Sequence, residues 1–538
     1  MKPLQQLLTL LPRATLLGPA DATITAIAYD SRQVSAGALF VALAGQHTDG
    51  HLFLEQALAR GAAALAVQED RRPLWEPLLR EGPQARVGRV GQEGIALIVV
   101  PDSRQALSAL AAALYDEPAR HLRVVGVTGT DGKTTTCYLI AHLLQAAGHR
   151  AGLITTVAFR AGGQWLANDL HQTTPEAPEV QALLTHMAAA GDRWAVVEAT
   201  SHGLAQRRLD HCYFDAAVFT NLAPDHLDFH GSMEEYLRAK GRLLDLLQEG
   251  QEGWSPATPT GPAGGHARIE KDKGPKAIVL NADEPTWRKL TPPAGARLVT
   301  YGLQGPADVR ALEVEPSPQG TRFRLISPWG EAILHTRLLG TFNVYNCLAA
   351  AALALGEGIP LPTIAEALAS FPGVPGRMER VEAGQPFTVV VDFAHAPNAL
   401  AQALRALRAS TEGRLIVLFG CAGERDPGRR FGMGRAAGEL ADFAVVTSDD
   451  PRSEDPQAIA VEVARGLQAA GRREGRDYRM VLERRQAIEE ALALASPGDA
   501  VLLAGKGHEG ALLLGGEAVP WDDRQVAREL LTQLSEGR

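Results

Sequence analysis

Short runs of apolar and often β-branched residues recur along the chain, and Ala- and Leu-rich stretches with helical spacing separate them. The short runs are typical of buried strands, and the longer stretches are typical of helices. The clearest run is Val124–Thr128, which leads through the turn Gly129–Gly132 into a helical pattern from about Thr134 to Ala147. Strands that alternate with helices in this way predict an α/β protein with mainly parallel sheets covered on both faces.

The alternation predicts three domains. Residues 1–118 form a small α/β domain, residues 119–374 a central phosphate-loop domain with a parallel sheet, and residues 375–538 a doubly wound, Rossmann-like domain. Residues from about 250 to 275 are rich in Gly, Pro and polar residues and show no period, so we expect a surface insertion there. The other predicted strands are 24–29, 37–43, 63–67, 151–155, 193–199, 214–220, 277–280, 297–301, 387–391, 414–419, 443–447 and 499–504, and the other predicted helices are 54–59, 399–408, 459–468 and 485–495.

Composition excludes several classes of protein. The 538 residues are 46% hydrophobic and 21% charged, and the net charge is −9, so no basic surface indicates a nucleic-acid partner. The four cysteines, Cys137, Cys212, Cys347 and Cys421, form no C-x-x-C pair, which indicates a reducing compartment and no zinc site. Because no apolar run is long enough to span a membrane and the N-terminus lacks a signal-peptide pattern, we expect a cytoplasmic protein.

The turn after Val124–Thr128 has the residues of a phosphate-binding loop. Its sequence is Gly129-Thr130-Asp131-Gly132-Lys133-Thr134-Thr135, which places backbone N–H groups at a helix N-terminus, where an anion is stabilised. Lys133 would reach the β- and γ-phosphates of ATP, and the hydroxyl of Thr134 would bind Mg²⁺. An ordinary Gly-containing turn is the alternative, and the Lys-Thr-Thr sequence argues against it.

Chemically functional side chains also follow other predicted strands. Glu198 lies at the end of one strand, and Asp225 and His226 follow the next. Ligands of such sheets bind at the carboxyl ends of strands, and a carboxylate there can hold Mg²⁺. For His226 the alternative is a hydrogen-bonded histidine that binds no metal. Lys240 lies on a later helix, where spacing alone indicates a solvated surface charge.

Together these motifs resemble those of the Mur ligases, ATP-dependent enzymes that extend the peptide of peptidoglycan precursors. The phosphate loop resembles the family's G-T-N-G-K-T-T, with Asp131 in place of Asn. Further segments that resemble family motifs begin at Glu198, Thr220, Leu339, Gly373 and Asp392. In the third predicted domain, the segments that begin at Gly420, Asp449 and Gly505 are similar to those of the branch that adds the third residue of the peptide.

The resemblance implies an amide ligase that joins a diamino acid to UDP-N-acetylmuramoyl-L-alanyl-D-glutamate through an acyl phosphate, with ATP and Mg²⁺ and as a monomer. It implies that Lys133, Glu198, His226 and Lys240 are catalytic, and that Thr134, Glu198, His226 and a carbamylated Lys240 hold metal. In addition to Gly129–Thr135, the implied nucleotide-binding residues are Asn346, Arg377 and Asp392. The implied muramoyl-dipeptide residues are Tyr29, Ser31, Gln46, His47, Thr48, Thr173, Thr174, Thr200, Gln206 and Arg208. The implied amino-acid-binding residues are Arg425, Asp449, Asp450, Pro451, Arg452, Gly505 and Glu509.

The identity of the amino acid stays open between two alternatives. Arg452 favours meso-2,6-diaminopimelate, because an arginine can bind its distal carboxylate bidentately and would repel the distal ammonium of lysine or ornithine. Asp450 replaces the family's usual Asn, and its negative charge favours a basic side chain. The alternative for the segment 449–452 is a plain loop turn with no role in amino-acid binding.

Two other classes of protein remain as alternatives to this branch. A folylpolyglutamate-type or cyanophycin-type ligase belongs to the same superfamily, and the predicted N-terminal domain argues against the folate enzyme. A catalytically inactive nucleotide-binding scaffold is the other alternative, and the presence of Lys133, Glu198, His226 and Lys240 argues against it.

Overall fold

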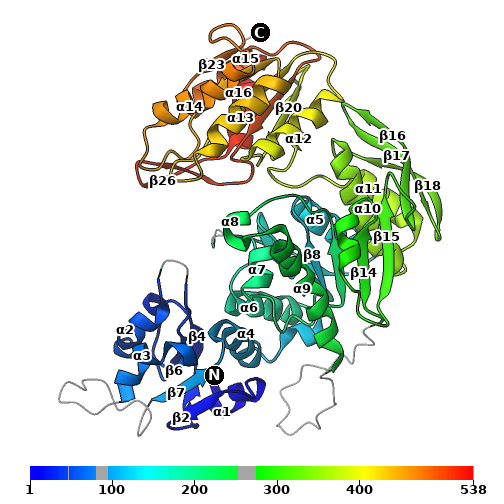
Figure 1. Ribbon diagram of the computed structural model, residues 1–538. Coiled ribbons are helices and arrows are strands. Elements are labelled where there is room, and N and C mark those ends of the chain that lie inside the picture. The colour runs from blue at the N-terminus through cyan, green and yellow to red at the C-terminus, as the bar shows by residue number, and fades with distance from the viewer. Residues whose placement is uncertain (46–47, 80–94, 169, 171, 253–273, 537–538) are drawn as a thin grey trace. The chain divides into compact units, whose positions relative to one another are not determined.

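The computed structural model describes residues 1–45, 48–79, 95–168, 170, 172–252 and 274–536 (Figure 1). The chain divides into two compact units. The first unit consists of Met1–Lys133 and Ala147–Thr300, and the second consists of Thr134–Ala146 and Tyr301–Arg538. The boundaries of the three predicted domains therefore stay a prediction. Within the described ranges, no helix is long and apolar enough to cross a membrane.

The N-terminal part of the first unit is a small sheet with the strand order β2-β7-β6-β5-β4. Strands β4 to β7 are parallel, and β2 pairs antiparallel with β7. Alternate strand residues face two apolar clusters, one against α1 and α4 and the other against α2 and α3. The elements are β1 (Lys2–Pro3), α1 (Leu4–Leu7), β2 (Thr15–Leu17), β3 (Thr23–Ile24), β4 (Ala26–Ala28), β5 (Ala38–Val41), α2 (Leu54–Ala59), β6 (Ala64–Gln68), α3 (Arg72–Trp75), β7 (Ala96–Val100) and α4 (Ser103–Leu114).

The main sheet of the first unit has the order β11-β10-β9-β12-β8-β13-β14-β15. Strands β9, β12, β8, β13 and β14 are parallel, whereas β10 and β11 form an antiparallel hairpin. The elements are β8 (Arg123–Thr128), β9 (Ala151–Ile154), β10 (Ala158–Ala161), β11 (Gln164–Ala167), α6 (Ala177–Ala189), β12 (Trp194–Glu198), α7 (Ser201–Ala205), β13 (Ala216–Phe219), α8 (Leu227–His230), α9 (Met233–Glu252), β14 (Ala277–Asn281) and β15 (Arg297–Gly302).

The register of this sheet brings three strand ends to one edge. Glu198 of β12 lies opposite Val127 of β8, and Phe219 of β13 lies opposite Thr128. The segments that follow β8, β12 and β13 therefore start beside one another, as expected at the carboxyl edge of a parallel sheet.

Helix α9 packs closely on β8 because Gly126 has no side chain. A Cβ at Gly126 would lie 2.7 Å from Leu243 Cδ1 and 2.9 Å from Phe214 Cε1. Residues three apart on a helix share one face, so the packing of Leu243 also turns Lys240 toward the sheet. In Figure 1, α9 lies beside α7, which follows β12.

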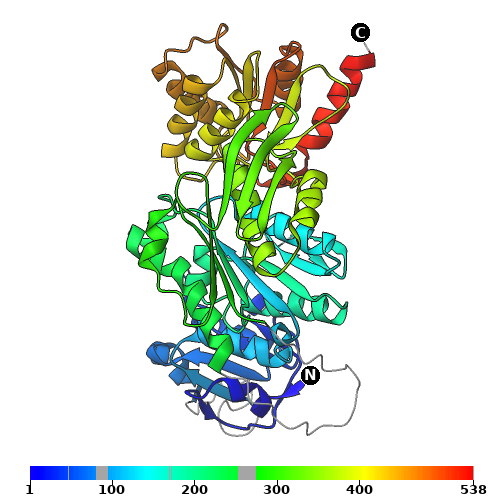
Figure 2. The same ribbon diagram turned by 90° about the vertical axis from the view of Figure 1, so that its right-hand side faces the viewer.

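The second unit begins with α5 (Lys133–Ala146), whose first residue still belongs to the first unit. Tyr301 and Gly302 at the end of β15 pair with β16, and β16, β17 and β18 form the antiparallel sheet drawn in green in Figure 2. The elements of this part are β16 (Val309–Ser317), β17 (Gly320–Ser327), β18 (Gly330–Thr336), α10 (Thr341–Gly356) and α11 (Leu361–Ser370).

The C-terminal part of the second unit is a doubly wound sheet of order β19-β20-β24-β21-β22-β23. All its pairs are parallel except β19 with β20, and alternate strand residues face clusters formed with α12, α13 and α14 or with α15 and α16. The elements are β19 (Glu379–Arg380), β20 (Thr388–Asp392), α12 (Pro397–Arg408), β21 (Leu415–Phe419), α13 (Gly428–Leu440), β22 (Phe443–Val446), α14 (Pro456–Ala469), β23 (Tyr478–Met480), α15 (Arg484–Ala493), β24 (Ala500–Ala504), β25 (Ala511–Leu514), β26 (Glu517–Pro520) and α16 (Asp523–Glu536).

The predicted α/β class with parallel sheets is confirmed, and the predicted strands and helices lie within a few residues of the observed ones. One prediction changes in detail: Gln251 and Glu252, placed at the start of the insertion, belong to α9. Residues 253–273 lie outside the described residues. The antiparallel strands β16 to β18 were not predicted, although their alternating polar and apolar residues carry the signal of half-buried strands.

Candidate active site

The phosphate loop is held by the segment that follows β13. Thr220 Oγ1 and Asn221 Nδ2 donate to the Asp131 carbonyl at 2.7 and 3.0 Å, and Asp131 N–H donates to Asn221 Oδ1 at 3.0 Å. At Gly129, where φ is +147°, a Cβ would lie 1.8 Å from Thr220 Oγ1, so only glycine fits. Lys133 Nζ donates to the Thr130 carbonyl at 2.7 Å. The predicted strand, loop and helix start are therefore present, and their neighbours fix the loop conformation.

Lys240 lies directly against this loop. Its Nζ donates to the Gly129 carbonyl at 2.6 Å, and it lies 4.4 Å from the ring centroid of Tyr236. The residue is 1% exposed, so the interpretation of Lys240 as a solvated surface charge is wrong. Burial lowers the pKa of Lys240 well below its usual value and Lys133 lowers it further, which Asp225 and Asp131 only partly oppose. The amine is therefore biased toward its neutral, nucleophilic form.

Glu198 is buried at the end of β12. Its carboxylate accepts hydrogen bonds from the backbone N–H and the hydroxyl of Thr156, each at 3.1 Å. The Thr156 hydroxyl also contacts the Thr173 hydroxyl at 3.0 Å. Glu198 is thus a fixed carboxylate at the same edge of the sheet as the phosphate loop.

Three histidines and Tyr236 lie close together in the segments that follow β12 and β13. The ring centroids of His202 and His226 are 4.7 Å apart, those of His202 and His230 5.4 Å, and those of His230 and Tyr236 5.1 Å. Burial, with His226 and His230 nearby, lowers the pKa of His202 to about 4. Burial lowers the pKa of His226; Asp225, whose carboxylate is 3.2 Å away, opposes this shift, whereas Lys133 and Lys240 add to it. A neutral imidazole is the form that binds metal.

The residues predicted to bind the muramoyl-dipeptide in the central part lie together. Thr174 Oγ1 donates to the Glu198 carbonyl at 2.7 Å and contacts Thr200 Oγ1 at 2.9 Å. Arg208 donates to the Thr174 carbonyl at 2.8 Å and to Gln206 Oε1 at 2.7 Å. Thr173 joins the group through Thr156. These five predicted residues therefore belong to one hydrogen-bonded network that reaches Glu198 through Thr174 and Thr156.

Of the N-terminal residues of the same predicted set, Tyr29 contacts α6, whereas Ser31 and Thr48 make their contacts within the N-terminal part. Tyr29 OH donates to Glu179 Oε1 of α6 at 3.0 Å, and Ser31 Oγ donates to Gln56 Oε1 at 2.7 Å. Thr48 is exposed, and its carbonyl accepts from Gly45 N–H at 3.0 Å. Gln46 and His47 lie outside the described residues.

The residues predicted to bind the nucleotide in the second unit form two separate groups. Asn346 is buried on α10, where Thr136 Oγ1 donates to its Oδ1 at 3.3 Å. Asp392 accepts from the N–H groups of Met378 and Ala394 at 2.7 and 2.9 Å. Arg377 lies 4.7 Å from the Phe393 ring centroid. Burial raises the pKa of Asp392, which Arg377 partly opposes.

The residues predicted to bind the amino acid surround the ends of β22 and β24. Asp449 is buried against Gly505, where a Cβ would lie 2.3 Å from its Oδ2. Burial raises the pKa of Asp449 to about 6, although Arg484 and Lys506 lower it. Arg452 lies 4.0 Å from Glu424, and Arg425 is exposed. The Pro451 carbonyl lies 2.1 Å from where a Cβ of Gly423 would be, so Gly423 allows this close approach.

Several residues outside the predicted sets also contact predicted site residues. The ring of His202 lies beside that of His226, and His230 N–H donates to the His226 carbonyl at 3.0 Å. Tyr236 contacts Lys240, and Lys506 contacts Glu509. His202, His230 and Lys506 stand inside segments that resemble family motifs, and that position was the available signal. The hydroxyl of Tyr236 contacts Thr130 Oγ1 at 3.1 Å, and nothing in the spacing of the sequence indicated this contact.

The donor atoms fit the predicted Mg²⁺ in part. Glu198 supplies carboxylate oxygens and Thr134 a hydroxyl, which a hard cation prefers, while His226 supplies an imidazole. Among the described residues, no cluster of three or more His, Cys, Asp or Glu side chains is placed to hold a metal. The unmodified amine of Lys240 is no ligand for Mg²⁺, whereas a carbamate on it would add two oxygens. Mg²⁺ often keeps few protein ligands and completes its shell with phosphate oxygens and water.

Comparison with known proteins identifies the family. The profile of the Mur ligase family catalytic domain matches residues 23–115, that of the Mur ligase middle domain matches residues 127–253 and 266–354, and that of the Mur ligase glutamate ligase domain matches residues 376–507. The chain belongs to the Mur ligase family. It is accordingly an ATP-dependent ligase of peptidoglycan biosynthesis, with the three Mur ligase domains in order.

Full-length relatives support the same conclusion. A UDP-N-acetylmuramyl-tripeptide synthetase of Roseiflexus sp. (strain RS-1) is 47% identical over 523 residues and covers 96% of both chains. A UDP-N-acetylmuramoyl-L-alanyl-D-glutamate--2,6-diaminopimelate ligase of Geobacillus thermodenitrificans is 40% identical over 525 residues and covers 98% of both. A solved structure of a ligase of the latter name is 31% identical, covers 95% of both chains and has a TM-score of 0.62.

We expect the substitution Gly129→Ala to weaken ATP binding roughly 100-fold, because backbone strain and displacement of Thr220 each cost on the order of 1–3 kcal/mol. Calorimetric titration with a non-hydrolysable ATP analogue measures this. The matched control is Gly148→Ala, which also has a positive φ, of +83°, and where no described atom lies within 4 Å of the added Cβ. An unchanged affinity in Gly129→Ala would show that this loop does not hold the phosphates.

Proposed function

We propose that this ligase adds a diamino acid to the D-glutamate carboxylate of UDP-N-acetylmuramoyl-L-alanyl-D-glutamate. The observation that carries the proposal is the meeting of the phosphate loop, Glu198 and the Thr174–Arg208 group at one sheet edge. The names of the relatives in Roseiflexus and Geobacillus support the same reaction. A carboxylate that reacts with the γ-phosphate would lie between these groups.

The reaction consists of two transfers. A carboxylate oxygen of D-glutamate attacks the γ-phosphorus of ATP, the bond to the ADP oxygen breaks, and an acyl phosphate forms. The amine of the second substrate then attacks the acyl carbon, phosphate leaves, and the nitrogen loses a proton. Because the first transfer brings two anions together, its catalysis depends mainly on positioning and charge neutralisation. Lys133 and the backbone N–H groups of the loop would supply both.

The Mg²⁺ of the proposal would be held by Thr134, Glu198, His226 and a carbamylated Lys240, and it would neutralise charge on the phosphates. Burial and a lowered pKa support the carbamate, because CO₂ reacts only with a neutral amine. The amine nitrogen attacks the carbon of CO₂ and releases a proton, which leaves an anionic carbamate in place of the neutral amine. Such an anion beside Lys133 is better compensated than a second ammonium would be.

We favour meso-2,6-diaminopimelate as the amino acid because of Arg452. The backbone of Arg452 is fixed against β25, since its N–H donates to the Leu513 carbonyl at 3.1 Å. Within the described chain, its buried Nε has no hydrogen-bond partner. A guanidinium presented in this way can bind a distal carboxylate. Asp450 favours the second candidate, lysine or ornithine, and the name of the Roseiflexus relative specifies no amino acid.

The proposed reaction predicts that phosphate release from ATP requires both the UDP-muramoyl-dipeptide and a diamino acid. Purified protein is assayed with each substrate alone and with the two together. Folate or cyanophycin substrates, offered in place of the muramoyl-dipeptide, test the other ligases of the superfamily. Release with no acceptor, or no release with both substrates, would refute the proposed function, and the second result would indicate an inactive scaffold.

We expect Lys240→Ala to lose activity roughly 100- to 1,000-fold, the range for removing one electrostatic catalytic group. Short-chain carboxylates added to this variant should restore part of the rate, because they supply the missing oxygens. The matched control is Arg238→Ala on the same helix, where the side chain is exposed and activity should be unchanged. A Lys240→Ala variant that is active without added carboxylate would contradict the carbamate.

For the amino acid, we expect meso-2,6-diaminopimelate to be incorporated in preference to L-lysine and L-ornithine. The three are offered to the purified enzyme at equal concentration, and the products are separated and quantified by mass. Incorporation of lysine or ornithine with none of diaminopimelate would refute our choice and leave the ligase reaction standing.

A further inference from the structure

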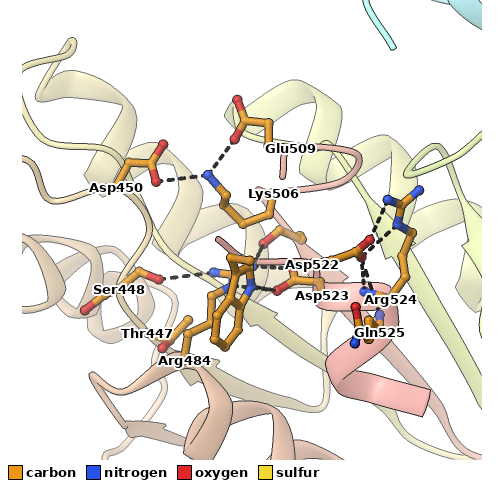
Figure 3. Close-up of polar contacts among 12 residues, drawn as sticks. Thr447, Ser448, Asp450, Arg484, Lys506, Glu509, Asp522, Asp523, Arg524 and Gln525 are labelled. Atoms are coloured by element: carbon orange, nitrogen blue, oxygen red, sulfur yellow. Dashed lines mark hydrogen bonds and ion pairs between the residues drawn. The ribbon is translucent and has the colours of Figure 1, made fainter. Parts of the chain in front are cut away.

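Lys506 is buried between two acidic side chains of the proposed amino-acid site. Its Nζ lies 2.9 Å from Asp450 Oδ1 and 2.7 Å from Glu509 Oε2, and its side chain is 1% exposed (Figure 3). Glu509 is more exposed, at 41% of its side chain, and Asp450 less, at 13%. One ammonium therefore contacts both Asp450, which departs from the family pattern, and Glu509, an implied amino-acid-binding residue whose carboxylate can bind an ammonium.

The charge of Lys506 is maintained by its surroundings. Burial alone would lower its pKa, but Asp449, Glu509 and Asp450 together raise it, so the amine is an ammonium. The other buried cation in Figure 3, Arg484, is committed elsewhere, since it donates to both oxygens of Asp523 at 2.8 and 2.6 Å. Among the described residues, Lys506 is thus the cation with ion pairs to both Asp450 and Glu509.

The carboxylate of Asp450 is fixed in this arrangement by β25. Its Oδ1 also accepts from Leu513 N–H at 3.0 Å, and the carbonyl of the same Leu513 accepts from Arg452 N–H at 3.1 Å. Asp450 and Arg452 are therefore attached to one residue of β25, on either side of Pro451. The net charge beside Arg452 consequently depends on Asp450 and Lys506 together.

We propose that Lys506 is a specificity-determining residue, whose positive charge sets the balance between amino acids with and without a distal carboxylate. The inference rests on the proposed function. The distal end of lysine or ornithine carries a net charge of +1, whereas that of diaminopimelate carries an ammonium and a carboxylate and is neutral overall. A cation at the site therefore disfavours the first kind relative to the second. An effect on how Glu509 is held would act on both kinds alike, because both present an ammonium.

The test is the ratio of kcat/KM for L-lysine to that for meso-2,6-diaminopimelate. We expect Lys506→Met to raise this ratio about tenfold, the effect of one charge several Å away. Asp450→Asn removes a negative charge and should lower the ratio. The double variant Asp450→Asn with Lys506→Met removes both charges and should return the ratio to within about threefold of the wild-type value.

The controls separate a charge effect from a structural one. Arg435→Met removes an exposed ion pair with Glu439 on α13 and should leave the ratio unchanged. Lys506→Met leaves a partly buried carboxylate without its cation, so if it does not fold, Asp450→Asn and the double variant carry the test. The amide oxygen that Asp450→Asn introduces can still accept from Leu513 N–H. An unshifted ratio in Asp450→Asn and in any folded Lys506→Met protein would overturn the inference. Undetectable lysine incorporation in all variants would overturn it as well.

A wrong proposed function and a wrong role of Lys506 give different results in this test. If wild-type protein forms no amide with any diamino acid, the proposed function is wrong and this inference with it. If wild-type protein forms the amide and the ratio is the same in all variants, only the role of Lys506 is wrong.

Discussion

The hydrogen bond from the buried Lys240 amine to the Gly129 carbonyl is the contact on which the proposed catalytic site depends. It exists because Gly126 lets Leu243 approach β8, which brings the residue three positions earlier on α9 under the phosphate loop. Tyr236 on the same helix face contacts the loop at Thr130. The loop that would hold the phosphates is therefore shaped by helix packing as well as by its own glycines.

The buried lysines Lys240 and Lys506 have opposite electrostatic surroundings. Lys240 lies near Lys133, and its pKa is lowered, whereas Lys506 lies among Asp449, Asp450 and Glu509, and its pKa is raised. Desolvation acts on both in the same direction, so the neighbouring charges decide the difference. The first lysine is suited to react as a neutral nucleophile, and the second is suited to remain a fixed cation.

The sequence predicted those features that depend on local pattern. The strand–loop–helix around Gly129–Lys133 and the strand ending at Glu198 were predicted because a buried parallel strand and a glycine turn are visible in a short window. The burial of Lys240 could not be predicted from residue spacing, because it results from the absence of a side chain at Gly126, more than a hundred residues earlier. The resemblance to a family supplied only a proposed role for Lys240, and residue spacing alone favoured the wrong interpretation of its exposure. The strands β16 to β18 were missed although their alternation was readable.

Asp450 shows why a substitution cannot be interpreted from its own charge alone. Compared with the usual Asn, it adds one negative charge, which taken by itself favours a basic substrate. In the structure that charge lies 2.9 Å from the Lys506 ammonium. The ammonium therefore offsets much of the electrostatic effect of Asp450 on a bound amino acid. The cancellation is incomplete, because Lys506 also neutralises Glu509 at 2.7 Å and one cation cannot compensate two anions. The proposed preference for a distal carboxylate then depends on how far the positive charge of Arg452 outweighs the remaining negative charge, a sum over groups from two separate segments of the chain.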